Sequence, residues 1–322
     1  MCWRVFGVVS CYLDDFLPSN KPQIPTMPPS RITIDEILQA GLILAGYSKK
    51  QRNRKYDQLL VWFKANYGSH PLVYCVLWEE LRPIDKERKL KYFFLCLSWL
   101  KNYDTEAILA GRWKLDDDTV RLWTNYYAEC LQIMCDNKIK LPDEWGNNVF
   151  VGVVDGTHCR CYKPTHPEFP FDSTYKSYKL GKDGLAYEVM VDMNGRPIWI
   201  NGPYPAGTPD ISIYNEKLAG IIPEGKLVLG DKGYKGPTTC SIPYSYDTYS
   251  VREFKRGHRA RMEQYNGRLI FFRILEDVFR SKAAGRLKKH KMVFYAVNAI
   301  VATQITCGFP LFNPLLLVHN LF

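Results

Sequence analysis

Two short apolar segments, far apart in the chain, each lead into an aspartate and a glycine. The first is Val149–Val154, followed by Asp155 and Gly156, and the second is Lys226–Gly230, followed by Asp231. Such apolar runs predict buried strands, and α/β sheets place their ligand chemistry at the carboxyl ends of strands. A third acid, Glu263, follows on a segment with helical periodicity. We therefore expect an α/β domain in which Asp155, Asp231 and Glu263 converge.

Each of these acids also has a simpler explanation. An aspartate before a glycine is often a turn residue, and Glu263 has Arg259 one helical turn before it as an ion-pair partner. It is the joint placement that favours a site. Three carboxylates from separate segments suit two hard divalent cations, Mg²⁺ or Mn²⁺. Two such ions activate a water or a DNA 3′-hydroxyl and stabilise the departing oxygen of a phosphodiester.

Positive charge is concentrated in the last third of the sequence. The chain has 322 residues, of which 46% are hydrophobic, and this excludes a disordered polypeptide. Of its net charge of +10, the segment from Arg252 to Lys291 carries +9, with thirteen Lys and Arg against four acids. This favours a polyanion such as a phosphate backbone, although a solvated basic helix face is the alternative. The expected DNA contacts are Arg252, Lys255, Arg256, Arg259, Arg261 and Arg268.

The ten cysteines include no CxxC pair, which favours reduced, buried thiols in an intracellular protein. His158, Cys159 and Cys161 have no second ligand pair, so we interpret the cysteines as core residues rather than zinc ligands. No segment has the length and apolarity of a membrane span. The apolar start is ended by Asp14 and Asp15 without a small-residue cleavage site, so we expect no signal peptide.

Composition divides the chain into four parts. Four prolines mark an extended linker after the apolar start, helical patterns follow, and alternating strands and helices come last. The predicted parts are an N-terminal segment with a linker (1–30), a helical region (31–141), an α/β domain (142–312) and a C-terminal tail (313–322).

Within the α/β domain, the pattern predicts one hairpin and a series of helices. Asn194-Gly195 is a strong hairpin turn between the strands 185–193 and 196–201. Thr208 with Pro209 predicts a capped helix that extends to about Ile221. Two further helices are expected at 259–279 and 288–305, the first from apolar residues at helical spacing.

The helical region contains a candidate helix-turn-helix at about 89–135. Helices are expected at 89–103, from Asp104-Thr105-Glu106, and from Asp116-Asp117-Asp118 through Cys135. A helix-turn-helix would present Thr119, Arg121 and Asn125 to DNA. An ordinary three-helix bundle explains the pattern equally well. The aspartate run also counts against DNA reading, because it would repel phosphates.

Four motifs together resemble the DDE transposases of the PIF/Harbinger type over residues 145–312. They are Val154–His158, Gly202–Asp210, Gly230–Tyr234 and Arg259–Asn266. The resemblance implies an RNase H-like mixed-sheet catalytic domain, preceded by a helix-turn-helix. It places Asp155, Asp231 and Glu263 at the positions of the catalytic, metal-binding triad. Asp210 matches a further acid of the pattern without a defined role, and stabilisation of a helix start explains it adequately.

The same resemblance implies a metal-dependent transposase or endonuclease that uses two Mg²⁺ or Mn²⁺ ions on double-stranded DNA, both transposon ends and target, in the nucleus. It also implies, in some cases, a separate DNA-binding partner protein, and it allows a homo-oligomer. Two alternatives stay open: a domesticated, non-catalytic DNA- or partner-binding protein, and a helical interaction protein that uses residues 31–135. Three clustered carboxylates argue against the first alternative, because their mutual repulsion is costly without a cation.

Overall fold

A five-stranded mixed sheet forms the framework of the α/β part of the chain. The computed structural model describes residues 32–162, 173–280 and 285–312; the predicted N-terminal segment and C-terminal tail lie outside these ranges. The sheet order is β3-β2-β1-β4-β5, with β1–β2 and β2–β3 antiparallel and β1–β4 and β4–β5 parallel. The strands are β1 (Phe150–Arg160), β2 (Gly184–Asp192), β3 (Pro197–Pro205), β4 (Leu227–Leu229) and β5 (Cys240–Ser241).

The central strand β1 is longer than the sequence predicts. It does not end at Asp155 but continues to Arg160, because its antiparallel pairing with β2 extends to Arg160 opposite Gly184. Its parallel pairing with β4 ends earlier, at Val153 opposite Leu229. Asp155 thus lies within β1, at the level where the neighbouring parallel strand has ended.

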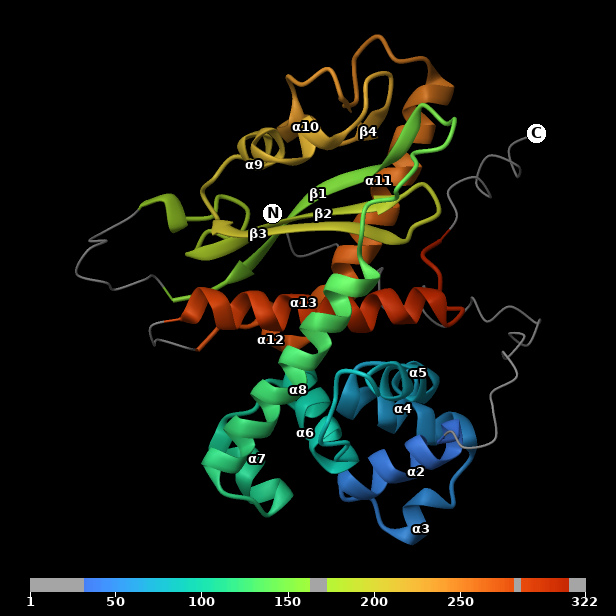
Figure 1. The fold of residues 1–322 in the computed structure, drawn as a ribbon, viewed down its shortest axis with the longest axis vertical. Helices are drawn as coiled ribbons and strands as arrows, with labels where there is room; N and C mark the ends of the chain where they lie inside the picture. The colour runs from blue at the N-terminus through green and yellow to red at the C-terminus, as the bar shows by residue number, and fades with distance from the viewer. Residues whose placement is uncertain (1–31, 163–172, 281–284, 313–322) are drawn as a thin grey trace. The chain divides into compact units, whose positions relative to one another are not determined.

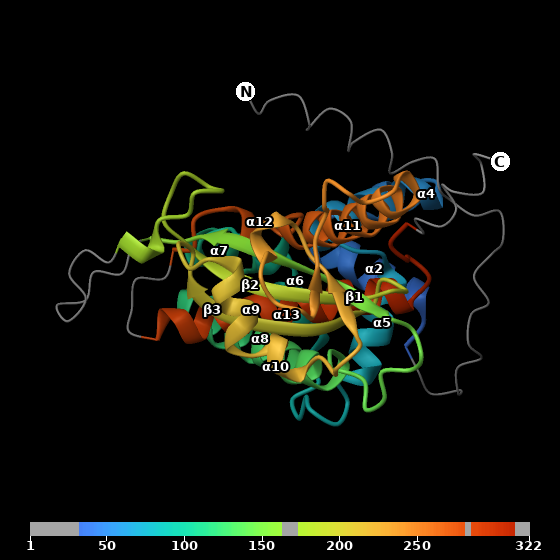
Figure 2. The same ribbon diagram turned by 90° about the horizontal axis from the view of Figure 1, so that it is seen from above.

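Helices cover both faces of the sheet (Figure 1). On one face, α9 (Asp210–Glu216) and α10 (Leu218–Ile221) enclose a core that includes Val154, Met190 and Tyr214. On the other face lie α11 (Tyr249–Ile270), α12 (Arg273–Glu276) and α13 (Arg286–Thr306). Figure 2 shows α11 beside β1 from above, in agreement with the contacts between the two elements.

Several predicted elements are confirmed and others are shifted. The hairpin at Asn194-Gly195 and the last helix are present. Thr208 is not the cap of α9; Pro209 holds that position without a side-chain hydrogen bond. The helix predicted at 259–279 begins ten residues earlier, after the Thr248 cap, and ends at Ile270. It ends there because the backbone of Phe272 is extended and its ring is fully buried.

The helical region contains α2 (Ile34–Leu44), α3 (Lys49–Arg52), α4 (Tyr56–Tyr67), α5 (Pro71–Glu80), α6 (Leu90–Asn102), α7 (Glu106–Trp113) and α8 (Asp117–Lys138). The last three match the predicted helices closely. Helix α8 packs along α13, which also contacts α5 and β3, so α13 lies between the sheet and the other helices (Figure 1). The change near residue 141 is thus one of secondary structure, and the predicted division into domains stays a prediction.

The cysteines of the described ranges are free thiols, and all of them except Cys307 are buried, as expected for core residues. Within these ranges, no helix combines the length and the apolarity that crossing a membrane requires.

Candidate functional site

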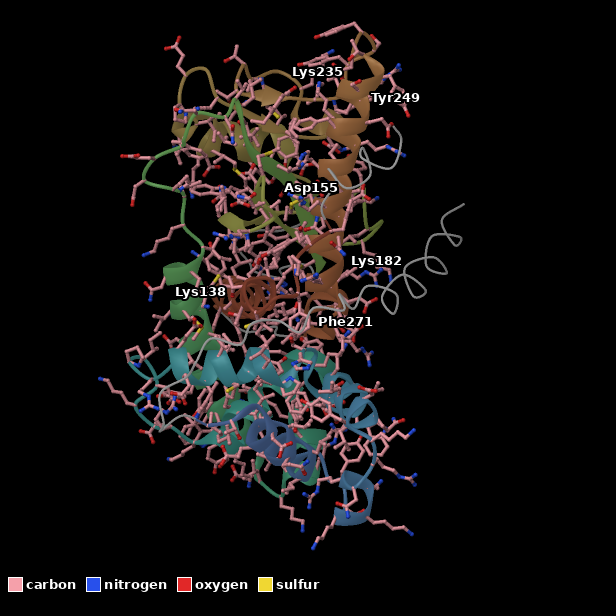
Figure 3. The ribbon with its side chains drawn as sticks, turned by 90° about the vertical axis from the view of Figure 1, so that its right-hand side faces the viewer. Lys138, Asp155, Lys182, Lys235, Tyr249 and Phe271 are labelled. Carbon is pink, nitrogen blue, oxygen red and sulfur yellow. The ribbon has the colours of Figure 1, made fainter. Side chains whose placement is uncertain are left out.

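Asp155 is held from two sides on the face of the sheet covered by α11. One carboxylate oxygen accepts a hydrogen bond of 2.8 Å from the backbone N–H of Gly156, and the other accepts one of 2.9 Å from Nδ2 of Asn266 on α11. The amide oxygen of Asn266 accepts in turn from the Thr157 hydroxyl at 2.6 Å. Figure 3 shows Asp155 beside the middle of α11, between Tyr249 and Phe271. Each oxygen keeps a lone pair for a further partner.

Asp231 lies just after β4, the strand next to β1 in the sheet. It follows β4, which runs parallel to β1, so the register that pairs Leu229 with Val153 brings Asp231 next to Asp155 along the same edge. Its Oδ1 accepts a 2.7 Å hydrogen bond from the N–H of Gly233 and so begins the short 3₁₀ turn Lys232–Tyr234. The register is consistent with the prediction that Asp155 and Asp231 are neighbours, but Asp155 lies within β1 and not at its end.

A third carboxylate, Asp210, is pressed against the same place. A Cβ atom added to Gly156 would lie 2.3 Å from Oδ1 of Asp210. A Cβ atom on Gly233 would lie 2.9 Å from Oδ1 of Asp231 and 3.3 Å from Oδ2 of Asp210. Glycine at both positions thus leaves the room that the two carboxylates occupy. The sequence motif around Asp210 was visible, but its placement depends on the path from β3 to α9, which the sequence alone does not define.

Two basic side chains that the sequence analysis did not assign to the site belong to this cluster. Nζ of Lys179 donates to Oδ2 of Asp210 at 3.0 Å and lies 3.4 Å from the Gly156 carbonyl oxygen. Nε2 of His158 lies 4.0 Å from Oδ1 of Asp210. No spacing rule connects Lys179 with Asp210, because a loop brings Lys179 to the carboxylates.

The three aspartates affect one another electrostatically. Burial raises the pKa of Asp155 to about 6; Lys179 and the N–H of Gly156 oppose the shift, and Asp231 and Asp210 add to it. Burial also acts to raise the pKa of Asp210, but His158 and Lys179 outweigh it and bring that pKa below its ordinary value. Three carboxylates thus face one lysine and one histidine, and a bound cation would reduce the repulsion among the carboxylates.

Glu263 does not contact the aspartates directly. It is exposed on α11, one turn before Asn266, and has no hydrogen bond or ion pair with the other described residues. The alternative that Glu263 pairs with Arg259 is therefore not realised. Arg252, Arg256, Arg259 and Glu263 recur at helical spacing, so they share one face of α11. That Glu263 completes the site stays a prediction.

Half of the predicted DNA contacts on α11 use their charged groups inside the protein. Lys255 donates to the Ile242 carbonyl and to Asp247, while Arg261 and Arg268 donate to backbone carbonyls near residues 309–312. Lys255 and Arg261 are also buried. The prediction missed this because charge counts do not distinguish the packed faces of a helix from its outer face. Arg252 and Arg256 are exposed, and Arg259 is half-buried.

Two of the three predicted DNA-reading residues of α8 are similarly engaged. The Thr119 hydroxyl donates to Asp116 at 2.7 Å, and Arg121 pairs with Glu106 and Asp118. Asn125 is half-buried, and its side-chain oxygen is enclosed. The aspartate run that counted against DNA reading thus binds two of the three residues.

A hard divalent cation fits the chemistry of the donor set, since Asp155, Asp210 and Asp231 offer only carboxylate oxygens. In the described ranges, no group of three or more His, Cys, Asp or Glu side chains is close enough to hold an ion as the side chains stand. The aspartates are near enough to raise the pKa of Asp155, yet they are not gathered around one point.

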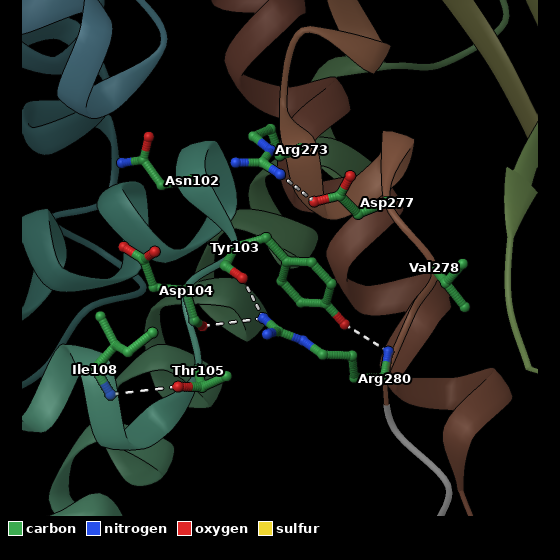
Figure 4. A pocket seen from close by; sticks show the side chains of 9 residues that line it. All are labelled: Asn102, Tyr103, Asp104, Thr105, Ile108, Arg273, Asp277, Val278 and Arg280. Carbon is green, nitrogen blue, oxygen red and sulfur yellow. Dashed lines mark hydrogen bonds and ion pairs between the residues drawn. The ribbon is translucent and has the colours of Figure 1, made fainter.

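Among the described residues, two of the cavities lie outside the carboxylate cluster. One of about 210 Å³ separates the α6–α7 turn from α12 (Figure 4). There the Tyr103 hydroxyl accepts from the backbone N–H of Arg280 at 2.6 Å, and Arg273 pairs with Asp277 at 3.0 Å. The hydrogen bond to Tyr103 joins the helical region to the segment after α12, while the Arg273–Asp277 pair lies within one turn of α12. The other, the Arg160 groove, has about 390 Å³ and is lined by Arg160, Lys176, Lys182 and Asp183 among others.

The comparison with protein families bears on the segment that contains these acids. Residues 154–301 match the model of the DDE superfamily endonuclease. The match begins one residue before Asp155 and includes Asp210, Asp231 and Glu263. A search of curated proteins gives no match. Among solved structures, the chain is similar to one described as a crystal structure of a pre-cleavage Mos1 transpososome. The sequence identity is 11% and the TM-score is 0.23, and the comparison covers 88% of this chain and 97% of that chain.

Proposed function

We propose that this chain is a metal-dependent DNA endonuclease or transposase of the DDE type, related to the PIF/Harbinger group, with an RNase H-like catalytic domain over residues 142–312. The observation that carries the proposal is the placement of Asp155 within β1 and of Asp231 just after β4, the parallel neighbour of β1, inside the segment that matches the DDE endonuclease model. The proposal includes action on double-stranded DNA in the nucleus, at transposon ends and at the target.

Asp155, Asp231 and Glu263 would hold the divalent ions, Mg²⁺ or Mn²⁺, in this proposal. When bound, such ions lower the pKa of an attacking water or hydroxyl and stabilise the leaving oxygen of a phosphodiester. Asn266 and the Gly156 N–H fix the orientation of the Asp155 carboxylate, so that its free lone pairs point in defined directions. Lys179 and His158 hold Asp210 beside the two glycines.

DNA would lie along the outer face of α11. Arg252, Arg256 and Arg259 share this face with Glu263, and Asn266 one turn further contacts Asp155. A phosphate backbone that follows these arginines is thereby led to the carboxylates. A helix-turn-helix role for α7 and α8 stays a prediction, and Arg121 would have to leave Glu106 to contact DNA.

The test is cleavage of linear duplex DNA by the purified full-length chain in Mg²⁺ or Mn²⁺. Asp155→Asn and Asp231→Asn should each reduce cleavage by at least roughly a hundredfold, since each removes a negative ligand from the reacting centre. Asp57→Asn is the matched control, because Asp57 is exposed on α4, outside the site. Equal cleavage by all four proteins would refute the proposal.

The non-catalytic alternative has a distinct outcome in the same experiment. Glu263 is exposed, and no three acidic side chains in the described part of the chain form a ready-made ion cage, so this alternative stays the second candidate. A domesticated DNA-binding protein would retard duplex DNA on a gel, with strong salt dependence, and would leave every phosphodiester intact.

A further inference from the structure

A short loop beside the carboxylates has a rigid frame. Residues 176–183 are closed by a bridge between Lys176 and Asp183 and by backbone hydrogen bonds from Ser177 to Lys182 and from Gly181 to Ser177, both 2.9 Å. The loop is also anchored to the sheet, because the fully buried Ser177 hydroxyl bonds Nδ1 of His158 at 2.8 Å and accepts from the Leu180 N–H at 3.0 Å. His158 follows Asp155 on β1 by three residues, so the site and the loop share one support.

The loop presents different chemistry on its two sides. On one side, Lys179 reaches Asp210 and the Gly156 carbonyl, as described above. On the other side, Lys176 and Lys182 line the Arg160 groove. A phosphate chain that leaves the carboxylates and crosses this loop therefore meets cations before and after it.

Tyr178 stands at the exposed tip of the loop. Its side chain is 91% exposed, more than any other large hydrophobic residue in the described ranges, and no aromatic ring of these ranges stacks on it. It is flanked by the lysines at 176, 179 and 182. A solvated aromatic ring between cations is the usual arrangement for stacking on a nucleic-acid base. The hydrogen bonds of the frame hold the loop backbone that carries Tyr178, so stacking would not require the loop to order first.

The ring and the groove both favour a single strand over a duplex. Base pairs inside a duplex stack on their neighbours, so the face of a base is available only at an unpaired position. A groove of about 390 Å³ also has the volume of a small-molecule site and does not accommodate a double helix.

We propose that residues 176–183 bind the single-stranded end of the DNA substrate, with Tyr178 stacked on an unpaired base and with Lys176, Lys182 and Arg160 at the adjoining phosphates. This inference rests on the proposed function, because it assumes that DNA reaches the carboxylates. It adds a specificity: ends with unpaired nucleotides bind more tightly than blunt ends of the same length.

The experiment measures binding without cleavage. The full-length chain is titrated, in buffer with EDTA, into a blunt duplex and into the same duplex with a short single-stranded overhang that contains 2-aminopurine. Anisotropy reports affinity, and 2-aminopurine fluorescence reports stacking. The variants are Tyr178→Ala, Tyr178→Trp and Tyr56→Ala, the last being a control with another exposed tyrosine, 49% exposed at the start of α4 and outside the residues proposed to bind DNA.

The wild-type chain should prefer the overhang and quench its fluorescence. Tyr178→Ala should lose roughly tenfold in overhang affinity together with the quenching and leave blunt-end affinity unchanged, while Tyr178→Trp and Tyr56→Ala should behave as wild type. Equal overhang binding and quenching by wild type and Tyr178→Ala would refute the inference and leave the proposed function standing. An absence of binding to either DNA would refute both. Thermal melting checks that Tyr178→Ala folds, as expected for a residue so exposed.

Discussion

Glu188 gives the sharpest stability prediction, because it is a buried carboxyl group with an incomplete set of partners. It lies on β2 opposite Gly156 and is 1% exposed. Trp199 donates to one oxygen at 3.0 Å, while the other has no hydrogen-bond partner in the described ranges. Burial raises the pKa of Glu188 from 4.5 to about 7, against the effect of Trp199 and with help from Asp210 and Glu216.

The magnitude follows from the difference between the folded and unfolded pKa. A shift of this size corresponds to about 3 kcal/mol in the free energy of unfolding, at 1.36 kcal/mol per pKa unit. Because the folded state holds the proton more tightly, this stability is fully present below about pH 4.5 and is lost as the pH rises through 7. Glu188→Gln removes the titration, so wild type should lose about 3 kcal/mol relative to the variant between these limits.

Urea denaturation of wild type and Glu188→Gln at a series of pH values measures this difference. Glu224→Gln, the same substitution at an exposed position, is the control. A Glu188→Gln difference that is independent of pH would show that Glu188 is solvated or paired in the folded state and would refute the reasoning.

Three further changes test the site and its support. Gly156→Ala should displace Asp210, since the new Cβ would lie 2.3 Å from its Oδ1. We expect the free energy of unfolding, measured by urea denaturation, to fall by about 1–3 kcal/mol. The control Gly220→Ala, at a position with open space around it, should be neutral or slightly stabilising. Asn266→Ala removes the 2.9 Å hydrogen bond to Asp155 and should weaken Mn²⁺ affinity, measured by calorimetry, roughly tenfold to a hundredfold. Unchanged affinity would mean that Asn266 does not position the carboxylate. Lys101 donates to the Phe271 carbonyl at 2.6 Å, and burial lowers the pKa of Lys101 from 10.5 to about 8. Because the unfolded chain holds this proton more tightly, the free energy of unfolding of the wild type should rise between pH 8 and 10.5. Lys101→Met should lack that rise in denaturation curves.

The sequence predicted most of the elements that build the site, because their signals are local. The apolar run before Asp155, the Asn194-Gly195 turn and the Asp116 cap each depend on a few adjacent residues, and each is realised. The predicted end of β1 was wrong, because the length of β1 depends on its pairing with β2, and the apolar run before Asp155 contains no information about that partner.

The composition of the site was harder to predict than the fold. Asp155 and Asp231 could be related from the sequence, since each follows a buried apolar run and the two runs belong to parallel strands. Lys179 and Asp210 come together through a loop and a helix start whose paths depend on packing elsewhere. The basic residues of α11 divide between outside and inside according to which face packs, and charge alone carries no information about that.

The central claim is that Asp155 and Asp231 bind divalent metal ions, and calorimetric titration of the full-length chain with Mn²⁺ tests it most directly. The account predicts saturable binding to wild type and to Asp57→Asn, and binding weakened at least roughly tenfold in Asp155→Asn and in Asp231→Asn, because each removes a carboxylate ligand. Wild-type affinity in both site variants, or no Mn²⁺ binding to the wild-type chain, would contradict it.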